Sequence, residues 1–302
     1  MRNSVLVIDD VKEQAEGLSK ALTGAISNCT FEPVFEEETI INAIENRFYN
    51  LAIVDLRMDG FSFDGIHVIK KIFEVNPFAK VLIVSAFKGE YFTKLKDLLL
   101  SGKVLDVLDK ESYDIWIPKL KSVIELYFQK LDQDSSEINN ALLQFYSETK
   151  NEKDTYLKGE KFEHFLSLVF QSIGFKQVLK RVIDGSKNEV DLIIRNDVAD
   201  TFLGKFGKYI LIECKNKPNE GVSKNDFIVF KSKIENSNGF AELGILATSG
   251  YIAKTTYIEA VRGSKDRNKI IFLSNIEIER LIRAENKLSE FKAIIDSQVK
   301  DN

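Results

Sequence analysis

Two groups of carboxylates, each accompanied by a lysine, are the residues of this chain best suited to chemistry, and they lie in opposite halves of its 302 residues. The first half supplies Asp9, Asp10, Asp55 and Lys110. The second half supplies Glu163, Asp191, Glu213 and Lys215. Carboxylates bind hard divalent cations, and lysine ammonium groups neutralise phosphate oxygens. Both groups therefore predict phosphate chemistry: acceptance of a phosphoryl group in the first half and cleavage of a nucleic-acid backbone in the second.

The first group follows the ends of short apolar runs that read as buried strands. Clear runs cover residues 5–8, 51–54, 81–84 and 104–108, and a weaker one lies near residues 31–35. Stretches with helical spacing separate them, which predicts five parallel strands in a doubly wound α/β sheet. Asp9, Asp55, Ser85 and Lys110 each lie within two residues of the end of a clear run. In such a sheet these carboxyl ends meet at one edge, where sites form.

Three carboxylates at one edge repel each other unless a cation lies among them. Their hard oxygen atoms favour Mg²⁺, with Mn²⁺ as a substitute. One carboxylate can then act as a nucleophile and become an acyl phosphate. The hydroxyl of Ser85 and the ammonium of Lys110 are suited to hold the new phosphoryl oxygens.

With these motifs, residues 1–131 resemble a response-regulator receiver domain. The matching segments are residues 5–10 with the acidic pair, residues 54–58 around Asp55, the pair Ser85 and Ala86, and Lys110. The resemblance implies that a cognate histidine kinase phosphorylates Asp55. It also implies that Mg²⁺ is bound by Asp9, Asp10, Asp55 and the carbonyl of Arg57.

Three departures from the receiver pattern bear on signalling. Asp59 replaces the usual proline, and Glu111 replaces the proline after the lysine. Val107 lies three residues before Lys110, where many receivers carry a switching Tyr or Phe. The absence of that aromatic residue directs attention to the last helix or to dimerisation as the output.

The joint between the halves fits two arrangements. A closing helix is expected over residues 115–131, and its apolar phase resumes at Ile138, Ala141 and Phe145 after a polar break at residues 132–136. One long helix with a heptad seam would pair as a coiled coil and make a homodimer. Two amphipathic helices, each packed on its own domain, fit the spacing equally. Residues 132–155 are therefore assigned as a helical linker.

The second half begins with a helix and continues with strands that carry its carboxylates. Helical spacing covers residues 156–173, and strand-like runs cover residues 177–183, 190–195, 209–215, 243–247 and 270–273, with helices near residues 224–234 and 253–261. Strand alternation directs Glu213 and Lys215 to one face and Cys214 to the other. Asp191 starts the apolar part of the preceding strand, so it can converge with Glu213 on one metal ion.

Cleavage of a phosphodiester requires an activated water and stabilisation of negative charge. A Mg²⁺ or Mn²⁺ ion held by Asp191 and Glu213 is suited to both, and Lys215 adds a positive charge beside the water. An ion pair at a sheet edge is the structural alternative for the same residues. The order of a glutamate-bearing helix, the Asp191 strand and the Glu213 strand favours a catalytic site.

This order resembles the PD-(D/E)xK restriction-endonuclease-like superfamily, in its Mrr-like branch, over residues 156–275. The matching residues are Gly159, Phe162, Glu163, Gly174, Phe175, Asp191, Glu213, Cys214, Lys215 and the segment 246–250. The resemblance implies that Asp191 and Glu213 bind the metal, that Lys215 is the catalytic lysine and that Glu163 is an accessory acid or metal ligand. Val190 takes the place of the proline that names the motif.

Composition sets the remaining limits. The length predicts two domains, and the two cysteines lie in different halves, which argues against a disulfide framework. Net charge is −4 over residues 1–131 and +3 over residues 159–302, which fits a polyanionic partner for the second half. The apolar run at residues 5–8 is too short for a signal peptide, and no segment reaches membrane-spanning length, so we expect a cytoplasmic protein without membrane contact.

The leading hypothesis is an α/β protein with a receiver domain (1–131), a helical linker (132–155) and a restriction-endonuclease-like domain (156–302). Its expected function is that of a phosphorylation-controlled, Mg²⁺-dependent DNA endonuclease in a two-component system, with a role in defence against foreign DNA as an analogy. Its expected partners are a histidine kinase, DNA and a second copy of the chain. The alternative is a response regulator whose nuclease-like domain binds DNA or another protein without cleaving.

Overall fold

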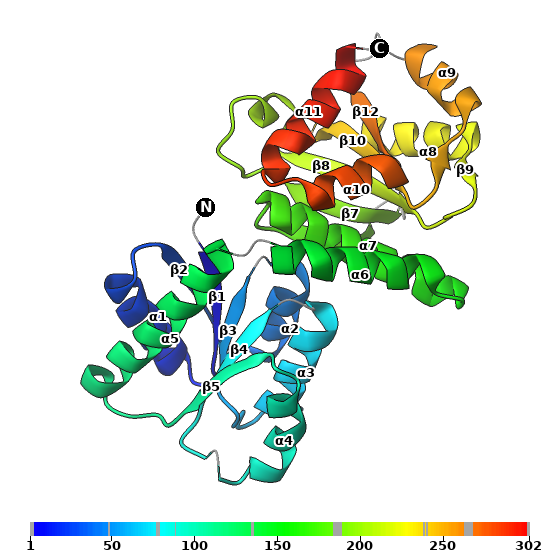
Figure 1. The fold of residues 1–302 in the computed structure, drawn as a ribbon. Helices are drawn as coiled ribbons and strands as arrows, with labels where there is room; N and C mark the ends of the chain where they lie inside the picture. The colour runs from blue at the N-terminus through cyan, green and yellow to red at the C-terminus, as the bar shows by residue number, and fades with distance from the viewer. Residues whose placement is uncertain are drawn as a thin grey trace. The chain divides into compact units, whose positions relative to one another are not determined.

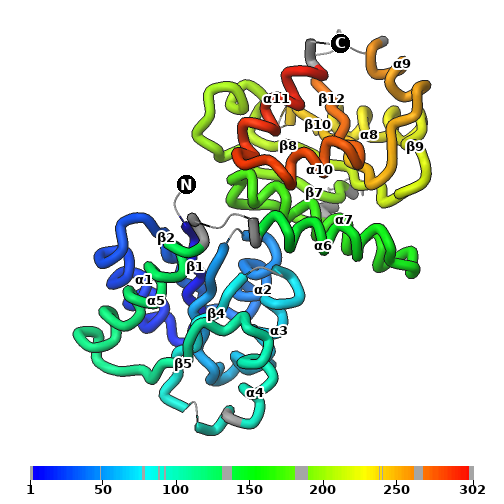
Figure 2. The backbone as a smooth tube through the Cα atoms, viewed as in Figure 1, coloured from blue at the N-terminus to red at the C-terminus, as the bar shows by residue number. Residues whose placement is uncertain are grey.

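The structure is a computed structural model that describes residues 3–47, 49–76, 79–87, 89–133, 136–183, 189–237, 239, 241–262 and 268–300. The chain forms two compact units, Met1–Ile138 and Asn139–Asn302. The division lies within the segment predicted as a linker. The chain completes one sheet before it enters the second (Figures 1 and 2).

The first unit contains a five-stranded sheet in the order β2-β1-β3-β4-β5. Its strands are β1 (Asn3–Ile8), β2 (Cys29–Val34), β3 (Leu51–Val54), β4 (Lys80–Val84) and β5 (Val104–Leu108). Its helices are α1 (Lys12–Ala25), α2 (Glu37–Asn46), α3 (Gly65–Val75), α4 (Phe92–Leu100) and α5 (Tyr113–Gln133). All neighbouring strands are parallel, which confirms the doubly wound sheet.

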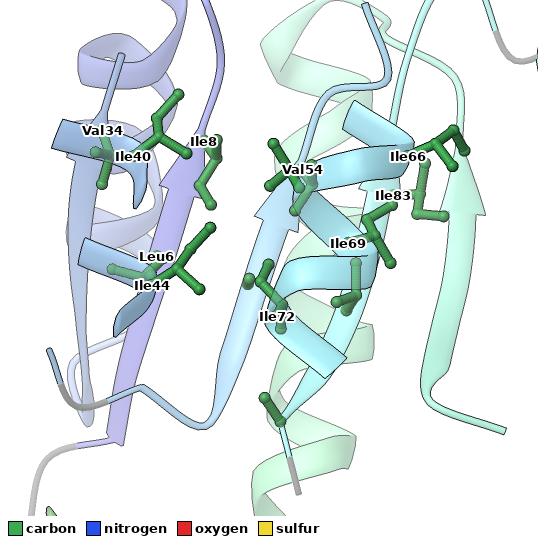
Figure 3. Close-up of a cluster of buried hydrophobic side chains, with 14 of the residues drawn as sticks. Leu6, Ile8, Val34, Ile40, Ile44, Val54, Ile66, Ile69, Ile72 and Ile83 are labelled. Atoms are coloured by element: carbon green, nitrogen blue, oxygen red, sulfur yellow. The ribbon is translucent and has the colours of Figure 1, made fainter. Parts of the chain in front are cut away.

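Alternation along the strands creates two hydrophobic cores, one on each face of this sheet. Leu6, Ile8 and Val54 point to the face covered by α2, α3 and α4, where Ile40, Ile44, Ile66, Ile69 and Ile72 pack against them (Figure 3). Val5, Val7 and Ile53 point to the other face, where α1 and α5 contribute Leu18, Leu22, Trp116, Leu120 and Ile124. Strands buried on both faces explain the continuous apolar runs in the sequence.

The joint contains two helices, and each is buried in its own unit. In α5, Leu120, Ile124 and Phe128 belong to the core under the first sheet. In α6 (Ser136–Asn151), Leu142 and Tyr146 are buried, and the ring of Tyr146 stacks on Phe165 at 4.7 Å. This packing favours two separate amphipathic helices over a continuous coiled-coil seam, because Leu120 and Ile124 are already covered. Residues 134 and 135, within the polar break, lie outside the described residues.

The second unit contains a mixed sheet in the order β12-β10-β8-β7-β6. Its strands are β6 (Val178–Ile183), β7 (Glu189–Arg195), β8 (Tyr209–Lys215), β10 (Ala241–Thr248) and β12 (Lys269–Leu273). The first three form an antiparallel meander, whereas β8, β10 and β12 are parallel. The strands β9 (Gly221–Val222) and β11 (Tyr251–Ile252) form a separate two-stranded parallel sheet.

Helices cover both faces of the second sheet. They are α7 (Thr155–Ile173), α8 (Lys224–Glu235), α9 (Lys254–Arg262), α10 (Asn275–Arg283) and α11 (Lys287–Lys300), with a short 3₁₀ turn η1 (Leu203–Lys205) before β8. Phe230 and Ile234 of α8 pack with Leu211 and Leu246 of the sheet on one face. A Cβ atom on Gly244 would lie 2.0 Å from Ile234, so this glycine allows α8 to approach the sheet closely.

The sequence analysis assigned no element beyond residue 273, yet α10 and α11 both lie there. Helix α10 starts with a capping box in which the Ser274 hydroxyl accepts from Ile276 and the Glu277 carboxylate accepts from the Ser274 backbone. Phe291 of α11 packs edge-on against Phe170 of α7. Among the helices that the structure describes, none is long and apolar enough to cross a membrane.

Candidate functional site

The acidic residues of the first unit meet at the carboxyl ends of β1 and β3, as expected. One carboxylate oxygen from each of Asp9, Asp10 and Asp55 lies within 4.8 Å of the others. The ammonium of Lys110, after β5, donates at 2.6 Å to Asp9 Oδ2 and at 2.6 Å to Asp55 Oδ2. Asp9 and Asp55 are both buried. A single lysine therefore bridges two buried carboxylates and balances only part of their negative charge.

Burial and charge have opposing effects on these groups. Burial raises the pKa of Asp9, and the hydrogen bond from Lys110 offsets only part of the rise. Burial alone would lower the pKa of Lys110, but its bonds to Asp55 and Asp9 outweigh that effect and raise the pKa overall. The lysine thus stays protonated where it can balance the negative charge of a phosphoryl group.

The loop after Asp55 is bound to the pocket by backbone donors. The N–H of Leu56 donates to Asp55 Oδ1 at 2.6 Å, and the N–H of Asp59 donates to Asp10 Oδ2 at 2.6 Å. A proline at position 59, as the receiver pattern has it, has no N–H to donate. The departure at Asp59 therefore adds a hydrogen bond that fixes the Asp10 carboxylate.

Gly65 allows the same loop to close. A Cβ atom at this position would lie 2.0 Å from the carbonyl oxygen of Asp55. Helix α3 starts there, and the preceding Asp64 caps it by accepting from the backbone N–H of His67 at 3.1 Å. The glycine thus brings the helix start against the backbone of the predicted phosphoacceptor.

Ser85 follows β4 and is fully buried, and its hydroxyl oxygen accepts from the backbone N–H of Phe87 at 3.2 Å. The guanidinium of Arg57 lies over the ring of Phe87, 4.4 Å from its centre. Val107, at the usual switching position, is half-buried and packs against the core that α4 covers. An aromatic residue does lie beside this pocket, but it follows β4 instead of ending β5.

In the second unit, Asp191 and Glu213 lie on adjacent antiparallel strands. If the register that pairs Leu192 with Ile212 is extended by one residue, Asp191 lies opposite Glu213, on the same face of the sheet. Asp191 Oδ2 accepts from the backbone N–H of Cys214 at 2.6 Å. Glu213 is buried at the end of its strand. The predicted convergence of these two carboxylates is what the strand register produces.

Two lysines hold the carboxylate of Glu213. Lys215 Nζ donates to Oε1 at 2.8 Å, and Lys233 Nζ donates to Oε2 at 2.7 Å. The side chain of Lys233 comes from α8 and is 17% exposed. The sequence analysis missed Lys233, although one signal was present: it lies three residues after Phe230 and directly before Ile234, at the edge of the apolar face of α8.

Electrostatics in this site follow from burial next to like charge. Burial and the nearby Glu213 raise the pKa of Asp191, and the lysines offset part of the rise. Burial would lower the pKa of Lys215, but the hydrogen bond to Glu213 outweighs it and raises the pKa. Burial and the charges of Asp191, Glu163 and Glu213 raise the pKa of the Cys214 thiol well above its ordinary value. Cys214 is thus a neutral thiol and a poor nucleophile.

Glu163 lies on α7, which contacts β6, β7 and β8, whereas α8 contacts β10 and covers the Leu211 face. The negative charge of Glu163 acts on Cys214. By strand alternation, the side chain of Cys214 lies on the face of the sheet opposite Glu213. Within the described ranges of the second unit, three acidic ligand atoms do not gather within 4.8 Å of one another. The accessory role of Glu163 stays a prediction.

Both sites offer the oxygen donors that Mg²⁺ and Mn²⁺ prefer. The three carboxylates of the first site are already gathered. The second site offers Asp191 and Glu213, and both oxygens of Glu213 carry an ammonium partner. The donor set fits a divalent ion at each site, although at the second site the ion would compete for Glu213 with two lysine ammonium groups.

Comparisons with known proteins match both halves. The model of the response regulator receiver domain family matches residues 5–115, and the restriction endonuclease model Mrr_cat matches residues 155–282. No curated protein matches the chain.

Solved receiver structures resemble the first half. A CheY-like receiver domain protein from Methanospirillum hungatei JF-1 is 19% identical, with 45% of this chain and 99% of that chain covered and a TM-score of 0.35. The receiver domain of a putative Luxo repressor protein from Vibrio parahaemolyticus is 21% identical, with 45% and 96% covered and a TM-score of 0.38. With both family models matched, this chain joins a response-regulator receiver domain to a domain of the Mrr restriction-endonuclease type.

Proposed function

We propose that this protein is a metal-dependent DNA endonuclease whose activity is set by phosphorylation of Asp55. The observation that carries the proposal is the arrangement of Asp191, Glu213 and Lys215 on β7 and β8. Two carboxylates share one face of the sheet, and a lysine on that face contacts one of them at 2.8 Å. This arrangement lies in the domain that matches a restriction endonuclease family.

In the proposed reaction, Asp191 and Glu213 bind Mg²⁺ or Mn²⁺. The ion supplies Lewis acidity toward the scissile phosphate and lowers the pKa of a bound water. Lys215, with its pKa raised, carries a positive charge that stabilises the developing negative charge on the phosphate oxygens. The backbone N–H of Cys214 holds the Asp191 carboxylate in place through its 2.6 Å bond. Glu163 is proposed as an accessory acid from α7.

In the receiver domain, the proposed phosphoacceptor is Asp55. A carboxylate oxygen of Asp55 attacks the phosphorus of a phosphohistidine on a partner kinase, and the N–P bond breaks as the O–P bond forms. Lys110, now 2.6 Å from Asp55, and the Ser85 hydroxyl are proposed to hold the transferred oxygens. Asp9, Asp10 and Asp55 would hold a Mg²⁺ ion, which would balance the charge.

DNA is the proposed substrate because the second half of the chain carries the basic excess, with a net charge of +3 over residues 159–302. The second candidate is an output domain that binds DNA or protein without cleaving. It is favoured by one observation: both oxygens of Glu213 are paired with lysines in this structure. Defence against foreign DNA, a cytoplasmic location and a homodimeric state remain part of the proposal.

The test is cleavage of plasmid DNA by the full chain with Mg²⁺ or Mn²⁺, with and without beryllofluoride as a mimic of phosphorylated Asp55. We expect cleavage whose rate changes with beryllofluoride in the wild type but not in Asp55→Asn. Asp191→Ala and Lys215→Ala are expected to bind DNA without cleaving. Cleavage that ignores beryllofluoride contradicts the gating, and identical behaviour of wild type and Lys215→Ala contradicts catalysis at this site.

A further inference from the structure

Asn216, directly after Lys215, has a side chain whose hydrogen-bonding groups all point into the protein. Its Nδ2 donates to the carbonyl of Thr149 in α6 at 3.0 Å and to the carbonyl of Lys158 in α7 at 2.8 Å. Its Oδ1 accepts from the Ser249 hydroxyl, after β10, at 2.6 Å. One amide thus connects the end of β8 to two helices and to the neighbouring strand.

Backbone hydrogen bonds next to Asn216 fix the backbone of Lys215. Its carbonyl oxygen accepts from the N–H of Ser249 at 3.2 Å and from the N–H of Lys217 at 3.0 Å. Ser249 is buried. Because the peptide between Lys215 and Asn216 is held on both sides, a displacement of Asn216 moves the backbone that carries Lys215.

Helix α6 has further bonds to the ends of the strands. The Tyr146 hydroxyl donates to Asn275 Oδ1 at 3.0 Å, and Lys150 Nζ donates to the same oxygen at 3.2 Å. The N–H of Asn275 donates to the carbonyl of Gly250 at 3.0 Å. The last turns of α6 are therefore hydrogen-bonded beside the ends of β8, β10 and β12, and Lys215 occupies one of those ends.

The contact also contains a polar group without a partner. Thr149 is fully buried, and among the described residues its hydroxyl has no hydrogen-bond partner. An unpaired buried hydroxyl costs free energy. A second arrangement of the last turns of α6 that paired this hydroxyl would recover part of the cost, and coupling between distant sites requires such an alternative arrangement.

We propose that Asn216 is a positioning residue that couples α6 to the catalytic lysine. Helix α6 is the first helix after α5, the last helix that lies wholly within the first unit. A shift of its last turns changes the bond from Asn216 to Thr149 and so changes the position of Lys215 beside Glu213. Phosphorylation of Asp55 then acts on cleavage through α6. This inference rests on the proposed function.

Asn196 provides a matched control in the same domain. Its Nδ2 also donates to two carbonyls, those of Leu203 at 2.8 Å and Gly207 at 2.9 Å. It follows Arg195 at the end of β7 that is paired with Tyr209, the start of β8, so it lies at the other end of these strands from Lys215. Asn196→Ala therefore removes the same kind of bonds without contact to α6 or Lys215.

The experiment measures plasmid cleavage by the full-length Asn216→Ala and Asn196→Ala variants, with and without beryllofluoride. For Asn216→Ala we expect kcat to fall by about 10- to 100-fold, because a displacement of a catalytic group by about 1 Å has effects of that size. KM is expected to stay within about twofold, and the response to beryllofluoride to disappear. Asn216→Asp, which keeps the acceptor for Ser249 but loses the donors to α6 and α7, is expected to behave like Asn216→Ala.

An unchanged response to beryllofluoride in Asn216→Ala overturns the coupling, as does equal loss of response in Asn196→Ala. Hydrogen–deuterium exchange separates this outcome from failure of the nuclease proposal. In the wild type, exchange in residues 139–151 and 209–217 is expected to change together on addition of beryllofluoride. In Asn216→Ala, only residues 139–151 are expected to change. Exchange that does not change in the wild type overturns the inference whether or not the protein cleaves DNA.

Discussion

The two acidic sites of this chain are built from the same residue types but distribute charge in opposite ways. In the receiver domain one lysine is shared by two carboxylates, since Lys110 contacts both Asp9 and Asp55 at 2.6 Å. In the nuclease-type domain two lysines share one carboxylate, since Lys215 and Lys233 contact Glu213 at 2.8 and 2.7 Å. The first site keeps an excess of negative charge that favours a divalent cation. The second is neutralised internally, so a cation has to compete with a lysine.

The largest expected effect is that of Glu213→Gln, because it removes a proposed metal ligand and the counter-charge of two lysines. We expect cleavage to fall by about 10³-fold, the loss typical when a charge-stabilising group leaves an active site. The measurement is single-turnover cleavage of a labelled duplex, with DNA binding measured separately. Glu220→Gln, an exposed residue of the loop after β8, is the control. Cleavage within tenfold of wild type in Glu213→Gln would show that this carboxylate does not take part in cleavage.

Two glycines, Gly65 in the receiver domain and Gly244 in the second domain, allow a comparison of tolerance to an added Cβ atom. A Cβ on Gly65 meets the Asp55 backbone at 2.0 Å, whereas a Cβ on Gly244 meets the terminal methyl of Ile234 at the same 2.0 Å. The backbone of Asp55 can move less to relieve such a contact than the terminal methyl group of Ile234 can. We therefore expect Gly65→Ala to lower the free energy of unfolding of its domain by about 3 kcal/mol, and Gly244→Ala by about 1 kcal/mol.

The two unfolding transitions are separable by their probes. The single tryptophan, Trp116, is buried in the receiver core, so its fluorescence in urea reports the unfolding of that domain. Circular dichroism records the unfolding of both domains. An unfolding transition that is seen by circular dichroism but not by fluorescence therefore belongs to the second domain. Gly24→Ala, where an added Cβ meets nothing within 4 Å, is the control for Gly65→Ala. Equal losses in the free energy of unfolding for Gly65→Ala and Gly244→Ala would contradict this difference between a backbone contact and a side-chain contact.

The sequence predicted the receiver site more completely than the nuclease site, for a physical reason. The residues of the first site directly follow apolar runs of a parallel sheet, so topology alone gathers Asp9, Asp55 and Lys110. The register of β7 and β8 brought Asp191 to Glu213 in the same predictable way. Lys233 instead depends on the rotation and closeness of α8, which Gly244 allows from the neighbouring strand β10. The local amino-acid sequence of a helix gives only a weak indication of how closely that helix packs on a sheet.

The same distinction explains the other differences. The sequence analysis assigned no element to residues 275–302, whereas α10 and α11 pack there against the sheet and α7. It grouped Glu163 with Asp191 and Glu213, and that role stays a prediction, because a sequence motif does not show which face of a sheet a helix covers. It left the arrangement of the joint open, because heptad-like spacing in α5 and α6 also describes two helices packed on separate cores.

Competition between a lysine and a metal ion at Glu213 predicts a gain of affinity. With Lys233→Met, one ammonium leaves Glu213, and we expect Mn²⁺ affinity at this site to rise about tenfold, equivalent to about 1.4 kcal/mol. Electron paramagnetic resonance of the full chain measures it, in an Asp9→Asn, Asp10→Asn, Asp55→Asn background that removes the three carboxylates proposed to bind a metal in the receiver domain. Lys231→Met, two residues away on α8 and paired with Glu235, is the control. Unchanged or weaker Mn²⁺ affinity in Lys233→Met would contradict the competition.

The smallest expected effect concerns a carboxylate outside both sites, whose pKa departs in the direction opposite to those of Asp9 and Asp191. The ammonium of Lys161 and the N–H groups of Asp154 and Lys153 lower the pKa of Glu152 to about 2. Because the pKa of Glu152 is lower in the folded state than its ordinary value of 4.5, the ionised carboxylate stabilises the fold at pH values above 4.5. This stabilisation is lost as the pH falls toward 2. Glu152→Gln is therefore expected to lower the urea midpoint of the second domain at pH 7, with a difference from wild type that narrows below pH 4.5. Glu148→Gln, an exposed residue of α6 bonded to Gln144, is the control. A difference for Glu152→Gln that is constant across this range would show that its bonds act through geometry and not through charge, unlike those of the two acidic sites.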